Sequence, residues 1–159
     1  MPRTILLAVL SLDGAWRTDA ASPAVLRRLL EAAGRPAGSA RTDIPELRRR
    51  VPGLRWMATD ALLAEARACG GKEPFVILGT PALHAALWEA APSRSGGFEL
   101  LVLQRPEIVL GPRRRTLASP FVPADGRRVR FRLLSARAVE EGLLCRYRPL
   151  SDAKKRIPR

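Results

Sequence analysis

The chain of 159 residues has very few of the side chains from which metal sites, disulfide frameworks and most catalytic sites are built. It contains two cysteines, Cys69 and Cys145, and a single histidine, His84. These are too few for a cysteine-rich metal site or a disulfide framework, although one bridge is possible if the fold brings both thiols together. We expect two reduced thiols in the core, no bound metal and no organic cofactor.

Long apolar runs and aromatic side chains are also scarce. No stretch approaches the roughly 20 apolar residues needed to cross a bilayer. Residues 2–12 resemble a short signal peptide with a basic start and an apolar run, but Ser11 interrupts that run and Asp13 follows it. We therefore expect a cytoplasmic protein with no membrane partner. The chain has only eight aromatic residues, so we expect no sequence-specific recognition of single strands.

Acidic residues become rare toward the C-terminal end, although the whole chain carries a formal net charge of +13. Residues 1–103 contain 13 Lys and Arg against 10 Asp and Glu, whereas residues 104–159 contain 15 against 5. A positive field on one part of a surface attracts polyanions, so nucleic acid is the first partner to consider. Codon bias is an alternative source of the charge, because arginines outnumber lysines by 25 to 3, but it does not explain so few acids.

The apolar content is sufficient for a self-supporting core, because hydrophobic residues make up 47% of the chain. A chain of this length buries about two thirds of its unfolded surface. We expect one compact α+β or α/β domain over residues 1–150. Within it, residues 1–91 are expected to be helix-rich and residues 98–150 to be strand-rich and mainly antiparallel. Residues 151–159 are expected to form a flexible basic tail.

Local patterns place the elements within that outline. The apolar run 4–12, which Asp13-Gly14 ends, is typical of a strand in the middle of a sheet. Ser22-Pro23 predicts the start of a helix that Gly34 ends. The other expected elements are a loop at 35–41, a short helix capped by Asp43 and ending at Val51, a helix from Met57 or Thr59 to Cys69, a buried strand at 74–78, a helix at 82–91, a linker at 92–97, a strand at 98–103 and a helical turn capped by Ser135.

Three features of the first half bear on function. The helices expected at 43–51 and 57–69 could form a helix-turn-helix, but the second carries no amide side chain to read a base edge, and helices packed on a sheet give the same pattern. Gly79-Thr80-Pro81 joins a strand to a helix N-terminus, which favours an anion, although one glycine is not a dinucleotide fingerprint. His84 has no catalytic partner near it in the sequence, so we expect an ordinary surface or interface residue.

The main functional prediction concerns the arginines between positions 127 and 148. In the segment 128–133 arginines alternate with apolar residues, so an extended strand has one cationic and one apolar face. The segment 144–148 repeats the pattern, and if the two strands pair, five guanidiniums share a surface. We predict that this surface binds the phosphate backbone of DNA or RNA, as part of a larger nucleoprotein assembly, because guanidinium donates bidentate hydrogen bonds to phosphate. The predicted nucleic-acid-binding residues are Arg113, Arg114, Arg115, Arg128, Arg130, Arg132, Arg146, Arg148, Lys154 and Lys155.

Two alternatives to nucleic-acid binding stay open. In the first, the arginines pair with acids from the first half of the chain, such as Glu31, Glu46, Asp60 or Glu65, or with another subunit. In the second, the chain is an enzyme: the order of its helices, the strand entered through 71–74 and the pair Glu140-Glu141 beside arginines resemble small lyases of the chorismate-lyase type. That resemblance spans residues 55–148. It implies an anionic substrate in a pocket lined by Arg114 or Arg115, Arg132 and Glu141.

Overall fold

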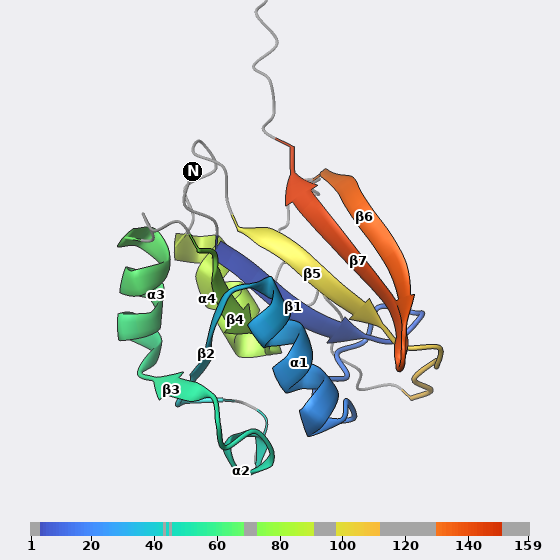
Figure 1. The fold of residues 1–159 in the computed structure, drawn as a ribbon, viewed down its shortest axis with the longest axis horizontal. Helices are drawn as coiled ribbons and strands as arrows, with labels where there is room; N and C mark the ends of the chain where they lie inside the picture. The colour runs from blue at the N-terminus through green and yellow to red at the C-terminus, as the bar shows by residue number, and fades with distance from the viewer. Residues whose placement is uncertain are drawn as a thin grey trace, which may run out of the picture.

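The computed structural model describes residues 4–42, 44, 46–68, 73–90, 98–111 and 130–150. They form one seven-stranded sheet in the order β3-β2-β4-β1-β5-β7-β6 (Figure 1). The five strands from β3 to β5 are parallel, and β7 and β6 continue the sheet in antiparallel pairing. The strands are β1 (Thr4–Leu10), β2 (Arg35–Ser39), β3 (Arg55–Met57), β4 (Phe75–Leu78), β5 (Glu99–Gln104), β6 (Phe131–Val139) and β7 (Gly142–Pro149).

Strand β1 lies in the middle of the sheet, between β4 and β5, as its continuous apolar sequence predicts. Every residue from Ile5 to Leu10 is buried. Successive side chains point to opposite faces, so Leu6 belongs to one hydrophobic core and Leu7 to the other. A strand covered on both faces needs no polar side, which is why the run shows no alternation.

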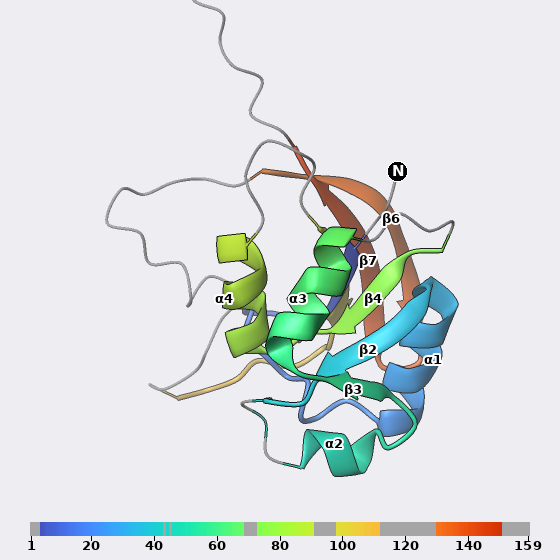
Figure 2. The ribbon, with the colours of Figure 1, turned by 90° about the vertical axis from the view of Figure 1, so that its left-hand side faces the viewer.

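Helices cover the two faces of the sheet separately, as Figures 1 and 2 show from two directions. Leu26 and Leu30 of α1 and Leu47 of α2 pack on the face that contains Leu7. The helices α3 and α4 pack on the face that contains Leu6. The helices are α1 (Pro23–Ala33), α2 (Leu47–Arg50), α3 (Thr59–Ala68) and α4 (Pro81–Ala90).

The first half of the chain is not helix-rich, which corrects the expectation from the sequence. The segment expected as a loop at 35–41 contains β2, which pairs with β3 and β4. Strand β3 separates α2 from α3, so these helices are not joined by a tight turn and do not form a helix-turn-helix. The fold is therefore an α/β domain in which helices alternate with parallel strands. In the part of the chain that the structure describes, no helix has the length and apolarity to span a membrane.

The strands β6 and β7 form an antiparallel hairpin, so the condition stated above, that the two arginine-containing segments pair, is met. The helical turn expected from Ser135 is wrong, because β6 continues to Val139 and the chain turns at Glu140-Glu141. A bulge at Leu134, between Leu133 and Ser135, shifts the register of the pair by one residue. The turn of the hairpin lies at the same edge of the sheet as the carboxyl ends of β1 and β5, because Leu143 pairs with Gln104 at the end of β5.

Candidate functional site

The carboxyl ends of β4 and β1 are the part of the fold best placed to bind a ligand. These neighbouring parallel strands are followed by helices on opposite faces, α4 after β4 and α1 after β1. The connection from β1 runs toward β2 and that from β4 runs toward β5, so their directions are opposite. In open α/β sheets ligands bind outside the carboxyl ends of the strands, where the direction of the connections switches. We call this part of the molecule, with the loop of residues 11–19 that follows β1, the switch-point edge.

Hydrogen bonds hold the two connections together at the switch-point edge. The buried hydroxyl of Thr18 donates to the carbonyl oxygen of Gly79 at 3.0 Å, and the Gly79 N–H donates to the Leu7 carbonyl at 2.8 Å. The hydroxyl of Thr80 accepts the N–H of Leu83 at 3.4 Å, as expected for the N-cap of α4. The N-terminus of α4, with its partial positive charge, is therefore fixed beside the loop that follows β1.

A cluster of three aromatic side chains lies beneath the switch-point edge, on the face of the sheet that α4 covers. His84 is only 1% exposed and packs edge-to-face against Trp16 and Phe98, with ring centroids 5.5 and 6.0 Å away. The expectation that His84 lies at the surface is therefore wrong. The indole Nε1 of Trp16 is buried and has no hydrogen-bond partner among the residues that the structure describes. An unpaired buried donor costs about 1–3 kcal/mol, so an acceptor from a ligand would stabilise this arrangement.

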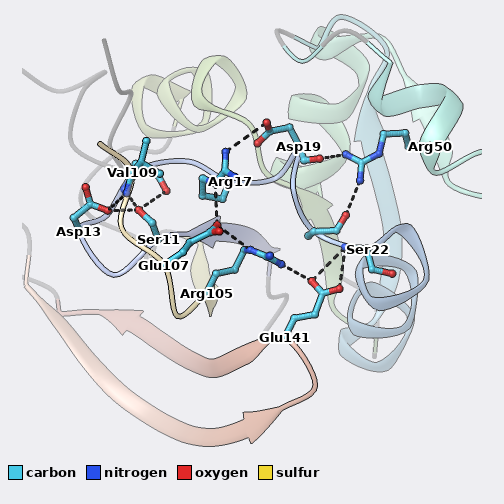
Figure 3. A network of polar contacts seen from close by, with 12 residues as sticks. Ser11, Asp13, Arg17, Asp19, Ser22, Arg50, Arg105, Glu107, Val109 and Glu141 are labelled. Atoms are coloured by element: carbon cyan, nitrogen blue, oxygen red, sulfur yellow. Dashed lines mark hydrogen bonds and ion pairs between the residues drawn. The ribbon is translucent and has the colours of Figure 1, made fainter. Parts of the chain in front are cut away.

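A network of charged side chains crosses the same edge around Glu107 (Figure 3). The Oε1 atom of Glu107 lies 2.9 Å from the Nε atoms of both Arg17, in the loop after β1, and Arg105, just after β5. Arg17 also lies 3.7 Å from Asp19, and Arg105 lies 2.7 Å from Glu141 in the hairpin turn. Five charged side chains thus alternate in sign along the edge.

The network ends on backbone groups of α1 and of the loop before it. The carboxylate of Glu141 accepts the N–H of Ser22, the N-cap of α1, at 3.1 and 3.2 Å. A carboxylate at that position also interacts favourably with the helix dipole. Arg50 donates to the carbonyl oxygens of Asp19 and Ala21. The hairpin turn, α1 and α2 are consequently all attached to the loop of residues 11–19.

The ion pairs around Glu107 stabilise its charged state and that of Arg17. The hydrogen bond from Arg17 lowers the pKa of Glu107, and Arg105 adds to this effect, against the opposing effect of burial. The same hydrogen bond raises the pKa of Arg17, with a smaller contribution from Asp19. Glu107 and Arg17 therefore stay charged at neutral pH.

The turn that ends β1 has its own hydrogen bonds. The Ser11 hydroxyl donates to the Asp13 carboxylate and accepts the Ala15 N–H at 3.0 Å. Asp13 also accepts the N–H of Val109 at 3.3 Å, which attaches the turn to the segment after β5. Reasoning from the sequence identified Asp13-Gly14 only as a strand end and missed Arg17, Glu107 and the rest of the network.

The predicted phosphate-binding face contains a buried acid. This acid is Glu99 of β5, whose side chain is 4% exposed. The Nε of Arg146 lies 2.7 Å from its Oε2 atom, and the Nε of Arg148 lies 2.9 Å from its Oε1 atom. Burial raises the pKa of Glu99, but the hydrogen bonds from Arg148 and Arg146 outweigh it, so the net shift is downward. These two arginines are therefore not uncompensated, and the alternative that the arginine face pairs with acids holds for them through Glu99.

The other predicted residues lie apart from this pair or outside the described residues. Arg130 and Arg132 are exposed, and Arg132 lies opposite Arg148 in the hairpin. Arg132 and Glu141, assigned above to one lyase-type pocket, lie at opposite ends of β6, more than about 20 Å apart at 3.3 Å per residue. The remaining predicted residues, Arg113, Arg114, Arg115, Arg128, Lys154 and Lys155, lie outside the described residues, as does Cys69.

The fold is shared with enzymes of solved structure, although no protein-family model and no curated protein matches the chain. A pyrimidine reductase-like protein from Corynebacterium diphtheriae has a TM-score of 0.60 at 14% identity, over 95% of this chain and 93% of that one. RibD from Acinetobacter baumannii has a TM-score of 0.56 at 14% identity, over 94% of this chain and 58% of that one.

A third similar structure is the deaminase/5-amino-6-(5-phosphoribosylamino)uracil reductase of Thermotoga maritima, with a TM-score of 0.57 at 9% identity. The match covers 94% of this chain and 57% of that one. The chain thus spans a little over half the length of this protein and of RibD, and nearly the full length of the Corynebacterium protein.

These likenesses correct the functional prediction from the sequence. The fold is shared with a pyrimidine reductase-like protein and with a deaminase/uracil reductase, whose names are those of small-molecule enzymes, so the prediction of a nucleic-acid-binding protein in a nucleoprotein assembly is wrong. The physical reason is found on β7, where two of the predicted phosphate-binding arginines, Arg146 and Arg148, are held by Glu99. A count of charges does not tell which of them are already paired.

Proposed function

We propose that the chain is a small-molecule reductase that binds a nicotinamide dinucleotide at the switch-point edge. The observation that carries the proposal is the shared fold together with the arrangement at this edge. In this chain, Trp16 packs against His84 of α4, and its buried indole N–H has no partner among the described residues. The names of the similar proteins favour a pyrimidine-type heterocycle as the substrate class. This proposal departs from the expectation of no organic cofactor made from the sequence.

The residues at this edge fit a dinucleotide in three respects. The N-terminus of α4 at Thr80 suits a pyrophosphate, because helix N-termini attract anions. The Nε1 of Trp16 suits an acceptor such as a carboxamide oxygen. At the ends of β2 and β3, the hydroxyls of Ser39 and Thr59 lie 2.8 Å apart and offer hydrogen bonds to a sugar.

The chemistry divides between the ligand and the protein. A bound reduced nicotinamide supplies a hydride to the substrate. The protein orients both partners: the Thr18–Gly79 hydrogen bond and the packing of Trp16 on His84 fix the edge before the ligand arrives. Leu12 and Ile108 are exposed apolar side chains on adjoining segments there, and they are suited to contact a planar ring and exclude water.

Titration of the full chain with NADPH and with NADH, followed by energy transfer from tryptophan to the reduced nicotinamide, tests the proposal. We expect saturable binding of at least one of them. We also expect Trp16→Phe, which keeps a ring but removes the donor, to weaken binding about tenfold. Trp56→Phe is the control, because the Trp56 N–H already donates to Val51 at 3.2 Å.

Absence of binding by the wild type would contradict the proposal. Equal affinities of Trp16→Phe and Trp56→Phe would show that the Trp16 N–H does not contact the dinucleotide. The substrate class is tested by following the loss of reduced nicotinamide absorbance with 5-amino-6-(5-phosphoribosylamino)uracil, the compound named for the Thermotoga maritima reductase.

A further inference from the structure

Residues 11–19 are held at the switch-point edge at both ends. At one end, the Arg17 N–H donates to the Val9 carbonyl at 2.7 Å and the Thr18 hydroxyl donates to Gly79 at 3.0 Å. At the other end, the turn contains Gly14, which has a positive φ of 82°, and the Leu12 N–H donates to the Glu107 carbonyl at 2.8 Å. What holds Glu107 therefore contributes to where this part of the loop lies.

Glu107 has the geometry for this task. Its Oε1 atom contacts Arg17 of the loop and Arg105 of the β5 end at the same distance of 2.9 Å, and its backbone carbonyl holds Leu12. Arg105 is fixed in turn by Glu141, whose carboxylate also accepts the Ser22 N–H. Glu107 therefore connects the loop of residues 11–19 with two regular elements, the hairpin and α1.

We propose that Glu107 is a positioning residue, which holds Arg17 and Arg105 so that the loop of residues 11–19 stays in its binding position against α4. It touches neither ligand nor reacting atoms. The effect on ligand affinity rests on the proposed function, whereas the effect on the loop does not. Without the carboxylate charge, the repulsion between Arg17 and Arg105 is no longer offset by the negative charge that they share, so the loop opens more often.

Hydrogen exchange of the full chain, read at the loop amides, tests this role directly. Glu107→Gln keeps the shape of the side chain but removes its charge. We expect exchange within residues 11–19 to become about tenfold faster, with central β1 and β4 amides unchanged. Arg17→Gln is a second variant that leaves the Arg105–Glu141 contact in place, and it should speed up the same amides.

The matched control is Glu140→Gln in the neighbouring hairpin turn. Glu140 also has an arginine partner, Arg28 at 2.7 Å, but that pair is exposed and does not join the network at Glu107. We expect the control to exchange like the wild type within residues 11–19. Unchanged exchange in Glu107→Gln, or an equal rise in the loop and in β1, would overturn the positioning role.

A pH series separates a charged anchor from a side chain that only fills space. The charged groups facing Glu107 are Arg17 and Arg105, and the next ones are Asp19, Asp13 and Glu141. The ratio of loop exchange in Glu107→Gln to that in the wild type should fall toward one as the pH drops through the lowered pKa of Glu107. A ratio independent of pH contradicts the role.

Ligand affinity provides the last readout, and it also tells the two proposals apart. If the wild type binds the reduced dinucleotide, Glu107→Gln should weaken binding about tenfold, and Glu140→Gln should not change it. If the wild type does not bind it, the proposed function fails and the exchange result still decides the role of Glu107. Tight binding by Glu107→Gln together with a loosened loop would overturn the link between loop position and affinity.

Discussion

Replacing Glu99 with glutamine is expected to lower the free energy of unfolding by about 3 kcal/mol. The reason is that Arg146 and Arg148 share this one buried carboxylate, and removing one member of a buried charge cluster costs about 3–5 kcal/mol. The lower end applies because the Arg148 side chain is 46% exposed and can return to water. Chemical denaturation followed by tryptophan fluorescence measures the loss.

Two controls show whether the loss comes from the buried charge. Glu140→Gln breaks a single exposed ion pair with Arg28 and should change the free energy of unfolding by less than about 1 kcal/mol. The second control is pH. Because the pKa of Glu99 is lower in the folded chain, its contribution is present above the unfolded pKa and is lost as the pH falls through the folded one. The difference between wild type and Glu99→Gln should therefore shrink in acid, and a constant difference would contradict this explanation.

Glu99 also shows what the sequence could have revealed about the arginines. It is the single charge next to a buried apolar run in β5, and a buried carboxylate requires a cationic partner. The alternation of Arg146 and Arg148 on one face of β7 supplies it. The prediction of an uncompensated cationic face failed because this acid lies before residue 104, in the part of the chain that was treated as separate from the C-terminal arginines.

Local patterns were sufficient for several elements of the fold. The Ser22-Pro23 start and the Gly34 end placed α1 correctly, since caps are local chemistry. The helix start expected at Gly79-Thr80-Pro81 was also predicted correctly, and Thr80 is the N-cap of α4. In each case the residues that fix the element are close together in the sequence.

The strand β2 had no such local signal. Its sequence, Arg-Pro-Ala-Gly-Ser, contains no β-branched or aromatic residue, and it becomes a strand because β3 and β4 pair with it on both sides. Gly38 illustrates this tertiary origin: a Cβ atom there would lie 2.7 Å from the ring of Trp56. Composition alone therefore predicted a loop.

The charged network at the switch-point edge was equally invisible. Arg17, Arg105, Glu107 and Glu141 come from three separate parts of the chain, and each alone is typical of a solvated surface charge. Only the parallel order of β1 and β5 and the direction of the hairpin bring them together. The order of the strands in the sheet could not be derived from the sequence, so the candidate site could not be assembled from it.

Replacing Gly142 with alanine is expected to cost about 3–5 kcal/mol and to displace the hairpin turn. Gly142 begins β7 with a φ of 150°, and a Cβ atom there would lie 2.1 Å from the Gln104 carbonyl oxygen. Backbone strain of about 1–3 kcal/mol therefore adds to a steric clash of similar size. Because Glu141 is the preceding residue, the displacement should also break its contact with Arg105.

Gly111→Ala is the matched control for this clash, because Gly111 has a φ of 139° but no atom of the described residues lies within 4 Å of the added Cβ. It should lose only the conformational part, about 1–3 kcal/mol, so the difference between the two variants isolates the contact with Gln104. Thermal or chemical denaturation gives that difference. Hydrogen exchange at the Ser22 amide reports whether its hydrogen bond to Glu141 is lost. Equal losses of stability in the two variants would mean that the hairpin moves away from β5 without cost. In that event the turn would be a flexible support for the network, and Arg105 would be held by Glu107 without a fixed contribution from Glu141.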